Sequence, residues 1–288
     1  MKKEKIQAFL ALLTATFFWA SAYIFVKQLL DNVSPYMLLV ARFGFASLIL
    51  IAIYGKKLLQ INSKMLKAGI IMGVFLFLEF FTFTVGLQYT TTSRSSLLIA
   101  AYIILLPFAY LIIMRKRPSL SDIIVSVICM VGVFIILGND LGSFHLGDIY
   151  CILCALCYAL YIVISSKYSK RYDSGILNVL QVSVTAILSI IILFFVKDHR
   201  FHISFKDGFQ LIYLIILCTT LPFFLILYGM KHLSATTSGI LLSLESVMAA
   251  FMGIIILHEA FTLNLFIGGV IIIFSFILSE LLPKISKK

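Results

Sequence analysis

Three charged side chains fall well inside long apolar runs of this sequence, namely Arg42, Glu79 and Glu245. A helix rises about 1.5 Å per residue, so each lies roughly 10–16 Å from the nearer end of its run. In a hydrocarbon layer about 30 Å thick, that depth is close to the midplane. A charge facing lipid there costs about 2.5–3.5 kcal/mol even on a lenient scale. We therefore expect all three side chains to point into a helix bundle.

Two interpretations are open for each of these charges. Arg42 and Glu79 have opposite signs and similar depth, and a buried ion pair is the favoured interpretation for Arg42. Glu79 continues a polar stripe through Thr82 and Gly86 at helical spacing, which favours a lined cavity. Glu245 has no obvious partner on its run of small residues, where helix packing is the alternative. For Glu245 we favour a ligand for an amino group or a site of protonation.

Aromatic residues also lie at unusual depths. Trp and Tyr normally sit at the two membrane interfaces, yet Trp19, the only Trp, falls near the middle of its run and shares a helical face with Tyr23. Tyr102 and Tyr158 belong to two other runs. Such side chains combine an apolar body with a hydrogen-bonding tip, as ligand sites often do. We predict that these four residues line a binding site or pore, with ordinary helix packing as the alternative.

Two prolines interrupt further apolar runs. Pro107 and Pro222 each remove a backbone hydrogen bond and kink a helix. Bent helices near the midplane mark sites and gates in membrane carriers. We predict hinge or kink positions there, and a static kink that serves packing is the alternative.

The sequence offers little for metal or catalytic chemistry. Cys151, Cys154 and Cys157 have a spacing that resembles metal ligation, but thiols three apart on a helix drift around it and cannot complete a tetrahedral site alone. All five histidines fall in loops or at the ends of runs. Motifs of hydrolases, zinc peptidases and phosphate-binding loops are missing. We therefore predict no catalytic residue, metal or cofactor, and the lack of a nucleotide site argues against an ATP-driven pump.

Long apolar helices must position these residues. Of the 288 residues, 62% are hydrophobic and 12% charged, whereas soluble domains have about 45–50% and 25%. This composition excludes a disordered chain, and the five cysteines inside apolar runs do not suggest a disulfide framework. The net charge of +11 sits in short clusters between apolar runs and not on one basic face, so nucleic acid is not an expected partner.

Ten apolar runs are long enough to span a membrane, which takes about 20 residues. The predicted spans are Ile6–Leu29, Pro35–Tyr54, Met65–Tyr89, Ser93–Met114, Leu120–Gly138, Gly147–Ser166, Ser174–Val196, Asp207–Met230, Thr236–Leu257 and Thr262–Leu282. Lys and Arg favour the termini and alternate loops, which places both termini in the cytoplasm by the positive-inside rule. We expect a multi-pass protein of a bacterial cytoplasmic (inner) membrane.

The two halves of the chain resemble each other. At an offset of 143 residues, residues 86–98 align with residues 229–241, and both segments have a glycine before a Thr/Ser-rich turn. Five spans per half is an odd number, so the halves must have opposite orientations. We predict an all-α polytopic protein of ten helices in two inverted five-helix repeats, residues 1–143 and 144–288. Many secondary transporters achieve alternating access through such repeats.

Short motifs spread over the chain add a family resemblance. They are Trp19-Ala20-Ser21, Ala41-Arg42-Phe43, Gly86 followed by residues 89–94, Gly147-Asp148, and Leu244-Glu245 with Leu257-His258-Glu259. In this order and spacing the chain resembles the EamA-like branch of the drug/metabolite transporter superfamily over essentially its whole length. It departs from the family pattern at Ser246, where Pro is usual, and at Lys116, where an acidic residue is usual. The resemblance implies ten helices, two EamA-like inverted repeats, and frequent export of amino acids or related metabolites.

Together these features predict a secondary active transporter that exports a small metabolite, such as an amino acid, by alternating access. Its expected partners are a small-molecule substrate, the lipid bilayer, and a coupling proton or counter-substrate. An intramembrane enzyme is an alternative, but it would need a nucleophile–base pair or a metal cluster inside the spans. A channel or a scaffold-type membrane protein is the other alternative.

Overall fold

The computed structural model describes most of the chain, and nearly all of that part is helical. The described residues are 2–90, 92–137, 145–245, 247–249, 252 and 263–285. The labelled helices are α1 (Lys2–Leu29), α2 (Pro35–Leu58), α3 (Ser63–Gln88), α4 (Thr92–Ala100), α5 (Tyr102–Met114), α6 (Leu120–Leu137), α7 (Leu146–Ser169), α8 (Ser174–Leu193), α9 (Phe205–Ile215), the π-helical segment η1 (Ile216–Thr220), α10 (Leu221–His232), α11 (Ala235–Leu242) and α13 (Leu263–Ile285). The all-α prediction is confirmed for this part of the chain.

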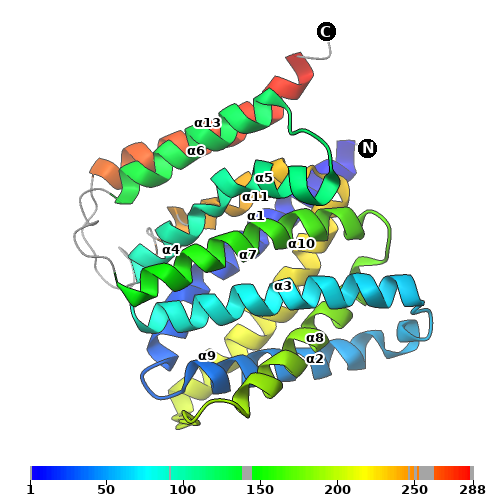
Figure 1. Cartoon of the computed structure of the whole chain (residues 1–288), viewed down its shortest axis with the longest axis vertical. Helices are drawn as coiled ribbons and strands as arrows, with labels where there is room; N and C mark the ends of the chain where they lie inside the picture. Colours follow the sequence, from blue (N-terminus) through cyan, green and yellow to red (C-terminus); the bar gives the residue numbers. More distant parts are fainter. Residues whose placement is uncertain are drawn as a thin grey trace.

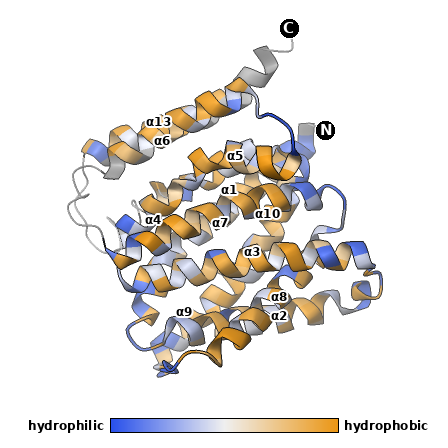
Figure 2. Cartoon of the chain, in the orientation of Figure 1, coloured by the Kyte–Doolittle hydropathy of each residue, from blue (hydrophilic) through white to orange (hydrophobic). Residues whose placement is uncertain are grey.

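Seven segments of the described chain are long and apolar enough to cross a membrane: α1, α2, α3, α4 with α5, α7, α8, and α9 through α10. Shorter apolar stretches lie in α6 and α13. Figure 2 shows hydrophobic residues along the helices and hydrophilic residues gathered at helix ends and loops. The chain is thus a multi-pass membrane protein, while the number of ten spans stays a prediction. Part of the predicted span Thr236–Leu257, with Ser246, His258 and Glu259 of the motifs, lies outside the described residues.

Helix starts follow local capping chemistry. The Ser34 hydroxyl accepts a hydrogen bond from the Met37 amide at 3.2 Å, directly before Pro35 opens α2. The Asp173 carboxylate likewise accepts the amides of Gly175 and Ile176 at the start of α8. These caps satisfy amides that have no partner inside the helix, and Pro is suited to the first turn because its missing N–H is one of them.

The fourth predicted span is interrupted where α4 meets α5. The Ala101 amide donates to the Leu98 carbonyl at 3.2 Å, a tighter turn than that of an α-helix. Pro107, inside α5, has no N–H for the carbonyl of Ile103 one turn earlier. The fourth span is therefore two helices joined at Ala101.

The eighth predicted span widens into η1 just before Pro222. The Leu221 amide donates to the Ile216 carbonyl five residues back. The side chains of Thr219 and Thr220 donate at 2.8 Å to carbonyls that are also five residues back. A π-helical turn of this kind changes the direction of side chains and exposes carbonyls, and such turns are frequent at functional sites.

The helices pack in defined pairs, α1 with α10, α3 with α7, α2 with α8, and α6 with α13. In Figure 1, α6 and α13 lie side by side at one edge of the bundle and α2 and α8 at the opposite edge. The start of α1 and the end of α13 lie at the same end of the bundle. Close contact of α3 and α7 requires Gly86 and Gly147, since a Cβ on Gly147 would lie 2.9 Å from the Gly86 carbonyl oxygen.

Candidate functional site

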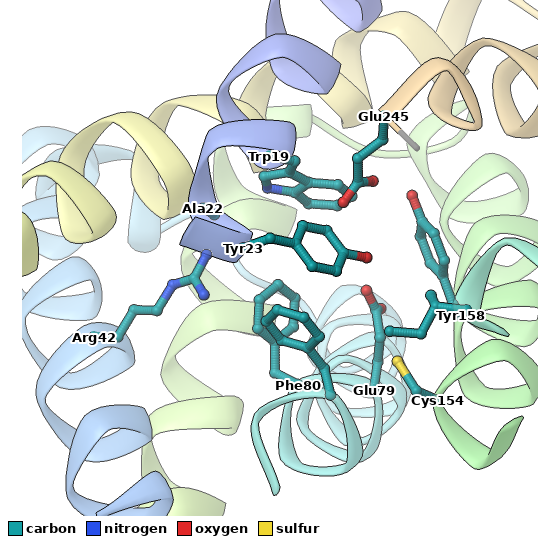
Figure 3. Close-up of a pocket in the computed structure, with 11 residues that line it drawn as sticks. Trp19, Ala22, Tyr23, Arg42, Glu79, Phe80, Cys154, Tyr158 and Glu245 are labelled. Carbon is teal, nitrogen blue, oxygen red and sulfur yellow. The ribbon is translucent and has the colours of Figure 1, made fainter. Parts of the chain in front are cut away.

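A small cavity lies inside the bundle between α1, α2, α3, α4 and α7 (Figure 3). Its lining residues are Trp19, Ala22, Tyr23, Arg42, Glu79, Phe80, Phe83, Ile99, Cys154, Tyr158 and Glu245. The volume of about 30 Å³ admits water. It does not admit a metabolite, so substrate binding would require the helices to separate.

The structure brings nearly all the residues predicted from the sequence to this cavity. Trp19, Tyr23, Arg42, Glu79, Tyr158 and Glu245 all line it. Tyr102 lies just behind the wall, where its ring centroid is 4.3 Å from that of Tyr158. Its hydroxyl donates to the Gly239 carbonyl of α11 at 2.6 Å, so Tyr102 ties the fourth predicted span to the ninth.

The two carboxylates face the same space. In Figure 3 the Tyr23 hydroxyl lies between the carboxylates of Glu79 and Glu245. Glu79 is 5% exposed, and its Oε2 atom has no hydrogen-bond partner in the described part of the chain. An unsatisfied buried polar atom costs about 1–3 kcal/mol and is uncommon. This oxygen is therefore available to a ligand, a proton or a water molecule.

Arg42 is held by hydrogen bonds to η1 and not by an ion pair with Glu79. Its Nε atom donates to Thr219 Oγ1 at 2.6 Å, and its Nη2 atom donates to the Cys218 carbonyl at 2.9 Å. The guanidinium also lies over the Phe80 ring, 4.7 Å from the centroid. The ion pair favoured from the sequence is therefore wrong for the described structure, because η1 offers Arg42 two acceptors that depth alone does not reveal.

The Cys218 carbonyl joins three elements of the site. In a regular α-helix it would accept the amide of residue 222, but Pro222 has no N–H. The freed oxygen accepts the Trp19 indole N–H at 3.0 Å and the Arg42 guanidinium. Pro222 thus does more than bend a helix. It provides the acceptor that fixes the orientation of Trp19 on α1 and Arg42 on α2.

Aromatic rings form the rest of the wall. Trp19 contacts Tyr158 and Phe80 edge to face, with ring centroids 6.0 and 6.3 Å apart, and Tyr23 contacts Phe83 at 5.0 Å. Edge-to-face contacts of this kind fix ring positions.

Several lining residues are not among those predicted from the sequence, chiefly Phe80 and Phe83 on α3 and Cys154 on α7. Phe83 lies one helical turn after Glu79 and therefore on the same face of α3, and this spacing could have indicated that it lines the cavity. The predicted polar stripe from Glu79 through Thr82 does not face the cavity. Thr82 is not a lining residue, and its hydroxyl donates to the Leu78 carbonyl. Cys154, one of the three thiols that are spaced three residues apart, lies on the wall. No group of three metal-ligating side chains occurs among the described residues.

An ion pair joins the starts of α4 and α7. Arg94 at the start of α4 binds Asp148 at the start of α7 through two contacts of 2.8 and 2.9 Å. Asp148 also accepts the His145 amide, and Lys27 of α1 donates to the carbonyls of Leu87 and Thr90.

The Arg94–Asp148 pair lies roughly 9 Å along α7 from Cys154, because six residues separate Asp148 from Cys154. The Asp148 side chain is 1% exposed and that of Arg94 is 12% exposed. The pair therefore ties α4 to α7 near the end of the bundle that lies away from the termini (Figure 1).

Comparison with known proteins extends over nearly the whole chain. The model of the EamA-like transporter family matches residues 6–138 and residues 145–281. An uncharacterized transporter of Archaeoglobus fulgidus is 25% identical over 286 residues, covering 96% of this chain and 87% of the relative. The uncharacterized transporter YoaV of Bacillus subtilis is 22% identical over 275 residues, covering 93% and 94%. A solved crystal structure shares the fold with a TM-score of 0.79 at 18% identity, covering 98% of this chain and 99% of that one.

Proposed function

Because this chain belongs to the EamA-like transporter family of the drug/metabolite transporter superfamily, we propose that it moves a small metabolite by alternating access around the central cavity. The observation that carries this proposal is the pair of carboxylates, buried Glu79 and half-buried Glu245, which share one cavity inside the bundle. Intramembrane charges are costly and are retained where they face a wet pathway or a ligand. A cavity that is large enough only for water and is lined by rings and two carboxylates fits a closed state of a carrier.

We propose ten helices in two inverted repeats, residues 1–143 and 144–288. Two observations support this arrangement. First, the contact of α3 with α7 has a counterpart in the contact of α10 with α1 when the halves are exchanged. Second, the interruption at Ala101 recurs at Ser243, close to the 143-residue offset of the repeat. Interrupted helices in corresponding positions of two halves mark the binding site in many transporters, and Ile99 and Glu245, beside these breaks, both line the cavity.

The proposed orientation places both termini in the cytoplasm of a bacterial cell, as the loop charges favour. The Arg94–Asp148 pair then closes the outer side of the cavity. Opening to the outside requires this pair to separate, and opening to the inside leaves it intact. Export from the cytoplasm is the proposed direction.

The proposed substrate carries an amino group, as amino acids and other organic amines do. Glu79 Oε2 has an open acceptor position, and Glu245 lines the same cavity. Carboxylates accept the N–H groups of an ammonium in short, charge-assisted hydrogen bonds. A proton or a counter-substrate would occupy the same carboxylates on the return step.

Counterflow in proteoliposomes tests the proposal. Purified protein is reconstituted with an unlabelled metabolite inside, and uptake of the same labelled metabolite is measured across a panel of amines and amino acids. A carrier gives saturable uptake that the internal metabolite accelerates. Protein-free liposomes serve as the control. Flux that rises linearly with concentration would indicate a channel, and chemical conversion of the metabolite would indicate an enzyme. Either result would overturn the proposal.

A further inference from the structure

The ionisable residues that line the cavity are unequal in sign. Glu79 and Glu245 are the two acidic side chains, and Arg42 is the only basic one among the described lining residues. With all three charged, the lining has one surplus negative charge. A surplus charge away from water is unfavourable unless a partner compensates it. A proton or a bound monocation compensates it, and the monocation takes the place of the proton when it binds, whereas a zwitterion such as a free amino acid brings no net charge.

Arg42 is poorly arranged to receive the carboxylate of an amino acid. Arginine binds carboxylates best through two parallel N–H groups. On Arg42 the edge formed by Nε and Nη2 already donates to Thr219 and to the Cys218 carbonyl. A ligand carboxylate would have to approach the end of the guanidinium while Glu79 and Glu245 repel it. In this cavity Arg42 mainly offsets one of the two carboxylates.

The aromatic side chains that line the cavity also favour a positively charged ligand. Rings carry negative faces, and they stabilise an ammonium group at about 0.5–2 kcal/mol while giving no comparable stabilisation to a carboxylate. Trp19, Tyr23, Phe80, Phe83 and Tyr158 all line the cavity. Figure 3 shows the Tyr23 and Tyr158 rings beside the two carboxylates. The cavity thus combines acidic acceptors with faces suited to a cation that has an apolar body.

We propose that the cavity selects organic amines without a carboxylate, bound as monocations, over the corresponding zwitterionic amino acids. This inference rests on the proposed transport function and narrows its substrate class. The unpartnered Glu79 Oε2 accepts the ammonium group, and the rings of Trp19 and Phe83 contact the apolar body.

Binding can be measured directly because Trp19 is the only Trp of the chain and lines the cavity. Its fluorescence is followed in purified protein titrated with three ligands that share one body: phenethylamine, phenylalanine and 2-phenylethanol. The amine should bind at least about tenfold more tightly than the other two, since a hydrogen bond to a charged group is worth that factor or more. A Glu79→Gln variant should lose about tenfold in amine affinity and little in affinity for the alcohol.

Each contrary result removes a definite part of the inference. Equal or tighter binding of phenylalanine would overturn the selection against zwitterions. Equal binding of the alcohol would show that charge plays no role. A fluorescence response to none of the three ligands would overturn the cation site. Amine binding without counterflow would instead contradict the transport proposal and leave the binding site standing, so the two failures can be told apart.

Discussion

A Glu245→Gln variant is expected to insert and fold like the wild-type protein but to lose coupled transport, with flux per protein about ten- to a hundredfold lower. The change keeps the size of the side chain and removes its charge. A hydrogen bond to a charged group contributes about 1.5–3 kcal/mol, which corresponds to that range. Since an amide of the same size can still accept and donate hydrogen bonds at this position, the fold should tolerate the change.

The measurement is counterflow at matched protein content, with the elution profile in detergent as the check on folding. Glu4→Gln is the control, because the same substitution then occurs at an exposed position at the start of α1. Normal counterflow in Glu245→Gln would remove Glu245 from the transport site.

Arg42→Gln is expected to destabilise the protein, and Glu79→Gln in the same chain is expected to restore part of that loss. Arg42 is 2% exposed and sits at electrostatic range of both carboxylates. Removing it leaves the buried Glu79 and the half-buried Glu245 without a compensating charge, which is a costly arrangement. Removing the charge of Glu79 as well relieves the repulsion. For neighbouring residues of this kind we expect a coupling of about 0.5–3 kcal/mol.

Thermal unfolding of the two single variants and the double variant gives this coupling. Arg42→Lys is the matched control, because it keeps the charge but not the two donors that reach Thr219 and the Cys218 carbonyl. It should therefore retain more stability than Arg42→Gln. Strictly additive effects of Arg42→Gln and Glu79→Gln would show that the two side chains do not share one electrostatic environment.

Depth in the membrane made much of the cavity predictable. A charge or a Trp placed near the middle of a span cannot face lipid cheaply. For this reason the sequence alone directs Glu79, Glu245 and Trp19 toward the interior of the bundle. The helical period also places Tyr23 on the same face as Trp19. These arguments predict how deep in the membrane a residue lies and which face of its helix it occupies.

The partners of those residues were not predictable, because the depth of a residue in the membrane does not determine which neighbouring helix its side chain contacts. Arg42 and Glu79 occupy similar depths, but Arg42 meets Thr219 and the Cys218 carbonyl instead. The only sign of a free helix carbonyl in a sequence is a proline four residues later. Pro222 is such a proline for the Cys218 carbonyl, but in the sequence alone it predicts only a kink.

The Arg94–Asp148 pair was not predictable for a different reason. Both residues stand at the ends of predicted spans, where charged side chains are ordinary. A charged side chain at either position has no evident free-energy cost, so the sequence does not suggest that Arg94 or Asp148 needs a partner. Their pairing depends on the close contact of α3 and α7 at Gly86 and Gly147, which sets the start of α7 next to α4.

The central claim is that one cavity is reached from both sides of the membrane in turn, and Cys154 on its wall allows this to be measured. The other four cysteines are replaced by alanine, and a membrane-impermeant thiol reagent is applied to vesicles of either orientation. We expect Cys154 to react from both sides. Asp148→Asn, which breaks the ion pair to Arg94, should raise the rate from the outer side by about tenfold or more. Reaction from one side only, in both the parent and the Asp148→Asn protein, would contradict alternating access at this cavity.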